Sequence, residues 1–228
     1  MARWRTRVAA LAGALALLAT ACSASPYRFV SNKAAGVYLK VPKRWTEVPR
    51  DALLPLYGQG DAEPSPEAFQ LLKSVLWERA FDASSSPAVG HFVLGGAGAP
   101  VARVTVRQLL PAERDQVSVK NLRQLLLGAY DEQLEGFKQL VRNPGTSEIV
   151  SADFVPLQDR ELRAHGHTGV RQVFEARKDD KTLYNVGFIA LVDDARTQLS
   201  TLAVHCSRDC FVANEHAIAA VLDSFTVR

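Results

Sequence analysis

Alternation of apolar and polar positions predicts most of the strands in this chain. Within residues 36–42, Val37, Leu39 and Val41 alternate with Tyr38 and Lys40. A period of two places one set of side chains on a buried face and leaves the other exposed. Further strands are predicted at residues 27–30, 102–107, 149–157, 168–177, 183–192 and 198–206. Short polar turns separate the last three, so we expect antiparallel hairpins there.

Apolar residues at helical spacing predict three helices. The first begins at Ser65 and Pro66, a typical N-cap and first helical residue, and its apolar face extends to Leu76. The longest is expected at about residues 118–142, before a Pro-Gly stop signal. A last short helix covers residues 218–225. Helices on both faces of a mainly antiparallel sheet define the expected fold class, an α+β protein built as an α/β/α sandwich.

Residues 82–100 are rich in Ser, Gly, Ala and Pro, which predicts a long surface loop with a short strand at residues 91–94. The run Gly95-Gly96-Ala97-Gly98 resembles a phosphate-binding loop only in its glycines. It lacks the Lys and Ser/Thr that hold phosphate and metal, so we interpret it as part of the surface loop.

The first 21 residues predict a signal peptide. Three arginines (Arg3, Arg5 and Arg7) precede an apolar stretch at residues 8–18, and small residues lead to Cys22. The apolar stretch is shorter than the roughly 20 residues needed to span a bilayer. We therefore expect a signal peptide at 1–21, a lipidated Cys22 with a short tether at 22–26, and one globular domain at 27–228.

The small residues before Cys22 resemble the lipobox of bacterial lipoproteins, in which the cysteine is diacylated, with palmitate among its chains, and becomes the new N-terminus. The position that usually holds Leu is Ala19 here, with Leu18 one residue earlier. The alternative is ordinary cleavage after Ala21, which would release a soluble protein with a free Cys22 thiol. The lipoprotein interpretation avoids an unpaired exposed thiol in an oxidising compartment.

The charge of the exported chain excludes the usual signature of nucleic-acid binding. Without the three leader arginines, the chain has 24 basic and 24 acidic residues, so its net charge is zero. Nucleic-acid-binding proteins typically carry a marked basic excess.

Cys206 and Cys210 are the remaining cysteines, and export makes a disulfide between them the expected state. A competing interpretation is a metal site formed by these two cysteines with His205 and His216. The chain lacks the CxxC and HxxxH spacings typical of such sites, so we expect the disulfide and no metal.

His165-Gly166-His167 is the most suggestive polar cluster, since two imidazoles flanking a glycine could hold a metal ion with Glu161 or Asp159. The alternative is a solvated turn, which we favour because two ligands do not make a site. An apolar pocket between the long helix and the sheet is also conceivable from the sequence. Tyr130, Phe137 and Trp77 would line it, or they would simply fill the core.

The segment Gly36-Val37-Tyr38-Leu39-Lys40-Val41-Pro42 followed by Trp45 resembles the opening of PsbP-like domains, and Ser224-Phe225 resembles their closing signature. Phe81-Asp82-Ala83 lies where that family often has a similar tripeptide. Together with the lipobox, these residues resemble the actinobacterial LpqN-type lipoproteins. The resemblance implies a PsbP-like α/β/α sandwich and a non-enzymatic role, with Trp45 and Phe225 packing in the core.

The sequence shows no hydrolase, metalloprotease or cofactor motif, so no catalytic residue and no cofactor is predicted. The first hypothesis is a lipid-anchored module on the outer face of the cell membrane that binds an envelope protein partner without catalysis. The alternative is a carrier of a lipid or another small apolar ligand. An enzyme of unknown class ranks third.

Overall fold

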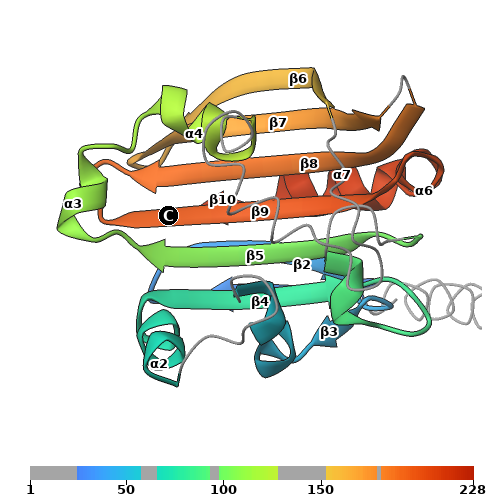
Figure 1. Ribbon diagram of the computed structural model, residues 1–228, viewed down its shortest axis with the longest axis horizontal. Helices are drawn as coiled ribbons and strands as arrows, with labels where there is room; N and C mark the ends of the chain where they lie inside the picture. The colour runs from blue at the N-terminus through green and yellow to red at the C-terminus, as the bar shows by residue number, and fades with distance from the viewer. Residues whose placement is uncertain (1–24, 58–65, 93–97, 128–152, 179–180) are drawn as a thin grey trace, which may run out of the picture.

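The computed structural model describes residues 25–57, 66–92, 98–127, 153–178 and 181–228, which form two antiparallel sheets with helices packed around them (Figure 1). Cys22 and the predicted signal peptide lie outside the described residues, as do residues 128–142 of the expected long helix. Among the described helices, none is long and apolar enough to cross a membrane.

The larger sheet has seven strands, and each described pairing in it is antiparallel. From one edge to the other it runs β3 (Thr46–Val48), β4 (Leu76–Asp82), β5 (Val101–Gln108), β9 (Gln198–Ser207), β8 (Lys181–Asp193), β7 (His167–Lys178) and β6 (Asp153–Ala164). The last four form the predicted meander, because short polar turns join neighbouring strands.

The smaller sheet joins the two ends of the described chain. Its strands are β1 (Tyr27–Asn32), β2 (Val37–Pro42) and β10 (Thr226–Val227), with β2 in the centre. Two helices, α6 (Arg208–Ala213) and α7 (Glu215–Ser224), come directly before β10. The hydroxyl of Ser224 accepts a hydrogen bond from the Lys40 amide at 2.9 Å, so the end of α7 contacts β2 just beyond its pairing with β10.

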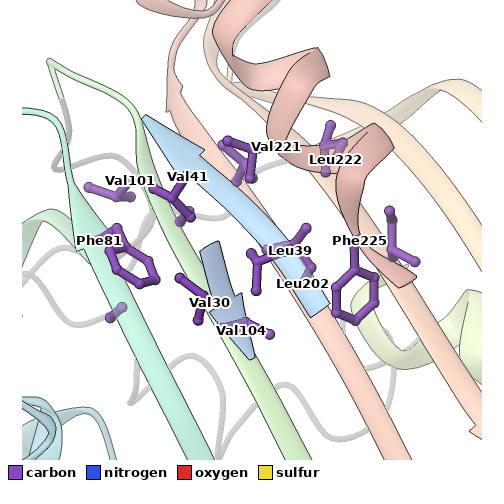
Figure 2. Packing of buried hydrophobic residues seen from close by; sticks show 14 of the residues in the cluster. Val30, Leu39, Val41, Phe81, Val101, Val104, Leu202, Val221, Leu222 and Phe225 are labelled. Carbon is purple, nitrogen blue, oxygen red and sulfur yellow. The ribbon is translucent and has the colours of Figure 1, made fainter. Parts of the chain in front are cut away.

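The small sheet and α7 cover one face of the large sheet and enclose the main core. Figure 2 shows Val30, Leu39 and Val41 from the small sheet facing Val104 and Leu202 from the large sheet. Valine and leucine at alternate positions of these strands bury one face each, as the period of two predicts. The buried pairs therefore fix how the two sheets stack.

The opposite face of the large sheet carries a second core under α4 (Val119–Leu127). Leu122 of α4 is 1% exposed and packs with Phe174 of β7 and Phe188 of β8. The short helix α3 (Pro111–Arg114) leads into α4. The predicted fold class, a mainly antiparallel α+β sandwich, is confirmed.

Towards β3, the same face meets α2 (Pro66–Val75) and two 3₁₀ turns, η1 (Arg50–Tyr57) and η2 (Val89–Phe92). The predicted strand at 91–94 is wrong over its described part, because residues 89–92 form the η2 turn. The prediction that the apolar face of this helix includes Leu76 is also wrong. The helix stops at Val75, and Leu76 begins β4, a strand that the sequence pattern did not reveal.

Gly36 lies in the turn between β1 and β2, where the end of the chain returns. Its φ is +67°, and its carbonyl oxygen accepts a hydrogen bond from the Arg228 amide at 3.1 Å. A Cβ atom at this position would lie 2.0 Å from the Arg228 carbonyl oxygen. Both the backbone conformation and the close approach therefore require glycine.

We predict that Gly36→Ala lowers the free energy of unfolding by about 1–2 kcal/mol, because alanine disfavours positive φ. Urea denaturation monitored by circular dichroism measures the change. Gly90→Ala is the matched control, since a Cβ there meets no atom within 4 Å. Equal midpoints for the two variants would contradict the assigned role of Gly36.

Candidate binding site at the end of the sandwich

A recess of about 270 Å³ opens where the β1–β2 turn approaches the ends of the large-sheet strands. Segments distant in sequence form its wall. They are the β1–β2 turn, the start of η1, the end of α2, and the ends of β4, β5 and β9. The side chains that give the recess its chemical character are Asn32, Arg50, Lys73, Trp77, Gln108 and Gln198.

The recess has a positive character, because the described residues of its wall include two basic residues and no acidic residue. Arg50 is held by a hydrogen bond of 2.6 Å from its Nη2 to the carbonyl oxygen of Leu76. Lys73 lies on α2 and forms an ion pair of 3.3 Å with Asp51, whose side chain is 75% exposed. Asp51 offsets part of the charge of Lys73. The guanidinium of Arg50 donates to the neutral carbonyl oxygen of Leu76, so its charge gives the wall its preference for an anionic group.

Carboxamide side chains in the wall form hydrogen bonds that hold the β1–β2 turn in place. Gln198 Nε2 donates to the carbonyl oxygen of Ala35 at 3.1 Å, which ties β9 to the β1–β2 turn. Asn32 Oδ1 accepts from the Ala35 amide at 3.2 Å and shapes the same turn. Trp77, which is half-buried, adds an apolar surface beside these polar groups. The recess thus combines cations, amides and one aromatic ring.

The size and lining of the recess limit what it can hold. Pockets that bury drug-sized ligands usually measure roughly 300–1,000 Å³ and are mostly apolar. This recess is smaller and mixed in polarity, so it fits a single carboxylate-bearing side chain or chain terminus better than an acyl chain. Sequence reasoning missed this site, because the residues of its wall come together only through the fold.

Cys206 and Cys210 are joined by a disulfide between the end of β9 and α6, with their Cα atoms 5.9 Å apart. The predicted pair is therefore confirmed. The disulfide occupies the sulfur atoms that the competing metal interpretation would need. His205 also points to the opposite face of β9 from Cys206, since neighbouring strand residues alternate.

His165 and His167 lie at the turn between β6 and β7. His165 has φ +50° and Gly166 has φ +72°, and the His165 carbonyl oxygen is 2.8 Å from His167 Nδ1. The two carboxylates proposed as further ligands have other partners. Asp159 pairs with Arg123 of α4, and Glu161 pairs with Arg163. This arrangement is that of a tight hairpin turn, and among the described residues no cluster of three possible ligands forms.

Trp77 does not take the position suggested by an apolar pocket under the long helix. It pairs with Val106 across β4 and β5 and packs against the main core, on the face of the sheet opposite α4. Tyr130 and Phe137, the other two expected lining residues, lie outside the described residues. The aromatic ring of Trp77 lines the recess instead.

A set of buried polar groups crosses the α4 face of the central strands. Glu78 of β4 has a fully buried side chain and forms an ion pair with Arg103 of β5. Four residues further along β4, Asp82 is fully buried and Asp82 Oδ2 lies 2.7 Å from His91 Nδ1. Burial raises the pKa of Asp82, but hydrogen bonds from the Ser84 backbone, His91 and the Ala88 backbone outweigh it and lower the pKa overall. These contacts hold the loop after β4 in place.

His205 of β9 belongs to the same set. Burial lowers its pKa to about 4, with a further lowering by the charge of Arg103, while a hydrogen bond with the Phe92 backbone acts in the opposite direction. Among the described residues, its Nδ1 has no hydrogen-bond partner. A neutral imidazole is therefore enclosed between β9 and η2.

We predict that the Cys206–Cys210 disulfide raises the free energy of unfolding by about 2 kcal/mol, because it closes only a short loop in the unfolded chain. Urea denaturation of the oxidised protein and of Cys206→Ala/Cys210→Ala measures this. Adding a reductant should lower the midpoint of the unmodified protein and leave the double variant unchanged. A reductant effect of equal size on both would contradict the prediction.

His205 should make the protein less stable in mild acid. The unfolded chain binds a proton near pH 6.5 and the folded chain only near pH 4, so the free energy of unfolding falls as the pH drops through this interval. The loss is on the order of 3 kcal/mol. Denaturation at about pH 7 and about pH 4.5 should show a smaller loss for His205→Gln. The exposed His216→Gln is the control, and an unchanged loss in His205→Gln would refute the assignment.

Comparisons with known proteins point to the fold. No family model and no curated protein sequence matches the chain. The solution structure of cyanobacterial PsbP (CyanoP) from Synechocystis sp. PCC 6803 matches with a TM-score of 0.53 and 9% identity, covering 91% of this chain and 96% of that chain. A crystal structure titled as a protein of unknown function, PA94 from Pseudomonas aeruginosa, a putative regulator, matches at a TM-score of 0.40 and 9% identity, covering 89% of this chain and 97% of that one. On the first of these matches, the chain has a PsbP-like fold.

Proposed function

We propose that the chain is an exported lipoprotein of the LpqN type, anchored through a diacylated Cys22 to the outer face of the cell membrane. Its domain is a non-enzymatic module that binds an acidic group of an envelope protein partner in the recess. The observation that carries the binding role is the wall of the recess, where Arg50 and Lys73 are the charged residues among those that the structure describes.

The anchor is supported by the order of segments at the N-terminus. Basic, apolar and small residues precede Cys22 in the order typical of an exported lipoprotein. The first strand begins at Tyr27, so only residues 23–26 would separate an acylated Cys22 from the sandwich. A tether of that length keeps the domain next to the membrane and makes envelope proteins its natural partners.

The recess supports a protein partner over a lipid cargo. A carboxylate entering it would meet the guanidinium of Arg50, a group whose planar N–H donors match carboxylate geometry. The hydrogen bond to Leu76 already fixes the position of this guanidinium, which reduces the entropy lost on binding. An acyl chain would gain little from a wall of this polarity.

The test is site-specific photo-crosslinking in the envelope. A photoreactive residue at Ala34, which is exposed and lines the recess, should form a covalent adduct with one protein, whereas the same residue at exposed Val212 on α6 should not. Adding Lys73→Gln should lower the adduct yield several-fold, and Lys120→Gln on α4 serves as its control.

Intact mass spectrometry of the full-length protein, purified from the envelope, tests both the lipid anchor and the carrier alternative. We expect the mass of a diacylated Cys22 and no further bound mass. The Cys22→Ser variant should lose both the acyl mass and its membrane fractionation. An unmodified Cys22 would refute the anchor, and a retained lipid without an adduct at Ala34 would favour the carrier.

A further inference from the structure

The outer face of the β1–β2 hairpin is aromatic, and no element of the described ranges packs over it. Val30, Leu39 and Val41 point into the core (Figure 2), so the alternate residues face outwards. The register places Phe29 opposite Lys40 and Ser31 opposite Tyr38. We call Tyr27, Phe29, Ser31, Tyr38 and Lys40 the hairpin face.

Phe29 is the most exposed large apolar side chain in the described part of the protein, at 80%, and Tyr38 is 39% exposed. Lys40 Nζ lies 5.2 Å from the centre of the Tyr27 ring, which holds its charge above the aromatic surface. A phenylalanine this exposed in a strand gains nothing from the fold itself. Its placement beside tyrosines and a lysine indicates a surface that contacts a binding partner when the protein functions.

Positive charge surrounds this face. Residues 23–50 contain six basic side chains and one acidic side chain. Arg28 lies over the Phe81 ring on the inner side of β1 and Arg50 lines the recess, so four of the six, Lys33, Lys40, Lys43 and Arg44, lie near this face. Lys33, Lys43 and Arg44 are exposed at the two ends of the hairpin. The one acidic residue, Glu47, is paired with Arg79 at 2.6 Å. Basic side chains are thus concentrated around the exposed aromatic residues.

The adjoining helix does not reverse this charge. Asp223, near the end of α7, is engaged in an ion pair with Arg171 of β7. Glu215 lies at the start of α7, at the opposite end of the helix from its contact with β2 through Ser224. The hairpin face therefore has exposed aromatic side chains at its centre and basic side chains around them.

We propose that the hairpin face binds the surface of an anionic phospholipid bilayer. Tyrosine and phenylalanine partition into the interfacial region of a bilayer, and lysine and arginine bind lipid phosphate groups. The face combines both kinds of residue on one exposed side. Contact with the bilayer would insert Phe29 and Tyr38 among the headgroups and place Lys40, Lys43 and Arg44 against phosphate.

The geometry near the N-terminus also favours a bilayer, and here the inference rests on the proposed function. If Cys22 carries acyl chains, residues 23–26 span at most about 14 Å, so the hairpin must stay near the headgroups. The face would then set the orientation of the domain. The recess lies at the turn end of the hairpin, about 20 Å along β1 from the tether, where a partner can reach it.

Vesicle co-sedimentation tests the proposal with a chain beginning at Ser23, which lacks both leader and lipid. Every contact described above lies within residues 25–228, so this chain retains them all. We expect binding to vesicles of phosphatidylcholine with phosphatidylglycerol, weak binding to phosphatidylcholine alone, and loss of binding in high salt. Equal binding to both vesicles, or no binding, would overturn the proposal.

Two pairs of exposed-residue variants assign the binding to this face. Lys43→Gln/Arg44→Gln should lower the partition coefficient roughly 30-fold, about fivefold per cation. Its matched control, Lys120→Gln/Arg160→Gln on α4 and β6, should leave the coefficient unchanged. Phe29→Ser should lower it roughly tenfold, and Leu157→Ser on β6 should not. Equal losses in the test and control variants would overturn the assignment.

This outcome is independent of the proposed function. The vesicle assay contains no acyl anchor and no protein partner, so a missing modification on Cys22 or a missing adduct at Ala34 does not affect it. A photoreactive residue at Phe29 that forms an adduct with a protein in the envelope, combined with no vesicle binding, would assign the face to a protein instead.

Discussion

The burial of Val37, Leu39 and Val41 against the large sheet is the contact on which the rest of the structure depends. Each of these side chains is at most 2% exposed, and burying each one contributes roughly 1.5–3 kcal/mol. Because β2 also pairs with β1 and β10, this burial brings both ends of the described chain to one layer. It positions the β1–β2 turn over the strand ends that form the recess, and it turns Phe29 and Tyr38 outwards. Core, recess and hairpin face therefore follow from one strand.

The two proposed surfaces lie on the same hairpin but differ in chemistry. The recess lies at the turn, where Arg50 and Lys73 surround a small polar space. The hairpin face is open, with aromatic side chains inside a basic rim. A domain resting on a membrane through this face would leave the opposite layer, with α4, directed away from the bilayer. Residues 22–228 carry equal numbers of basic and acidic side chains, so the local concentration of basic residues distinguishes these two surfaces from the rest of the domain.

Prediction from sequence succeeded where local pattern and burial agree. The half-buried strands at β2 and β5 were predicted because alternation identifies a face that is buried in any fold, and the meander strands were predicted because short polar turns separate apolar segments of strand length. It failed at β4, where Glu78 and Asp82 interrupt the apolar pattern, yet both side chains are fully buried. Charged residues in a central strand are stable only because Arg103 and His91 approach them from other segments. The residue pattern around Glu78 and Asp82 does not show which distant residues pair with them, so the sequence analysis missed this strand and its polar contacts.

Local sequence patterns were sufficient to predict the alternating strands and the pair of cysteines four residues apart, and they also predict a leader before Cys22. These follow from local chemistry, since a basic and apolar leader, a period of two, and a short Cys spacing each constrain nearby residues alone. Local patterns do not show that Trp77 faces the small sheet and not α4, or that Arg50 and Lys73 share a wall with Gln198. Those facts depend on strand register and sheet stacking, which arise from the packing of side chains far apart in the chain.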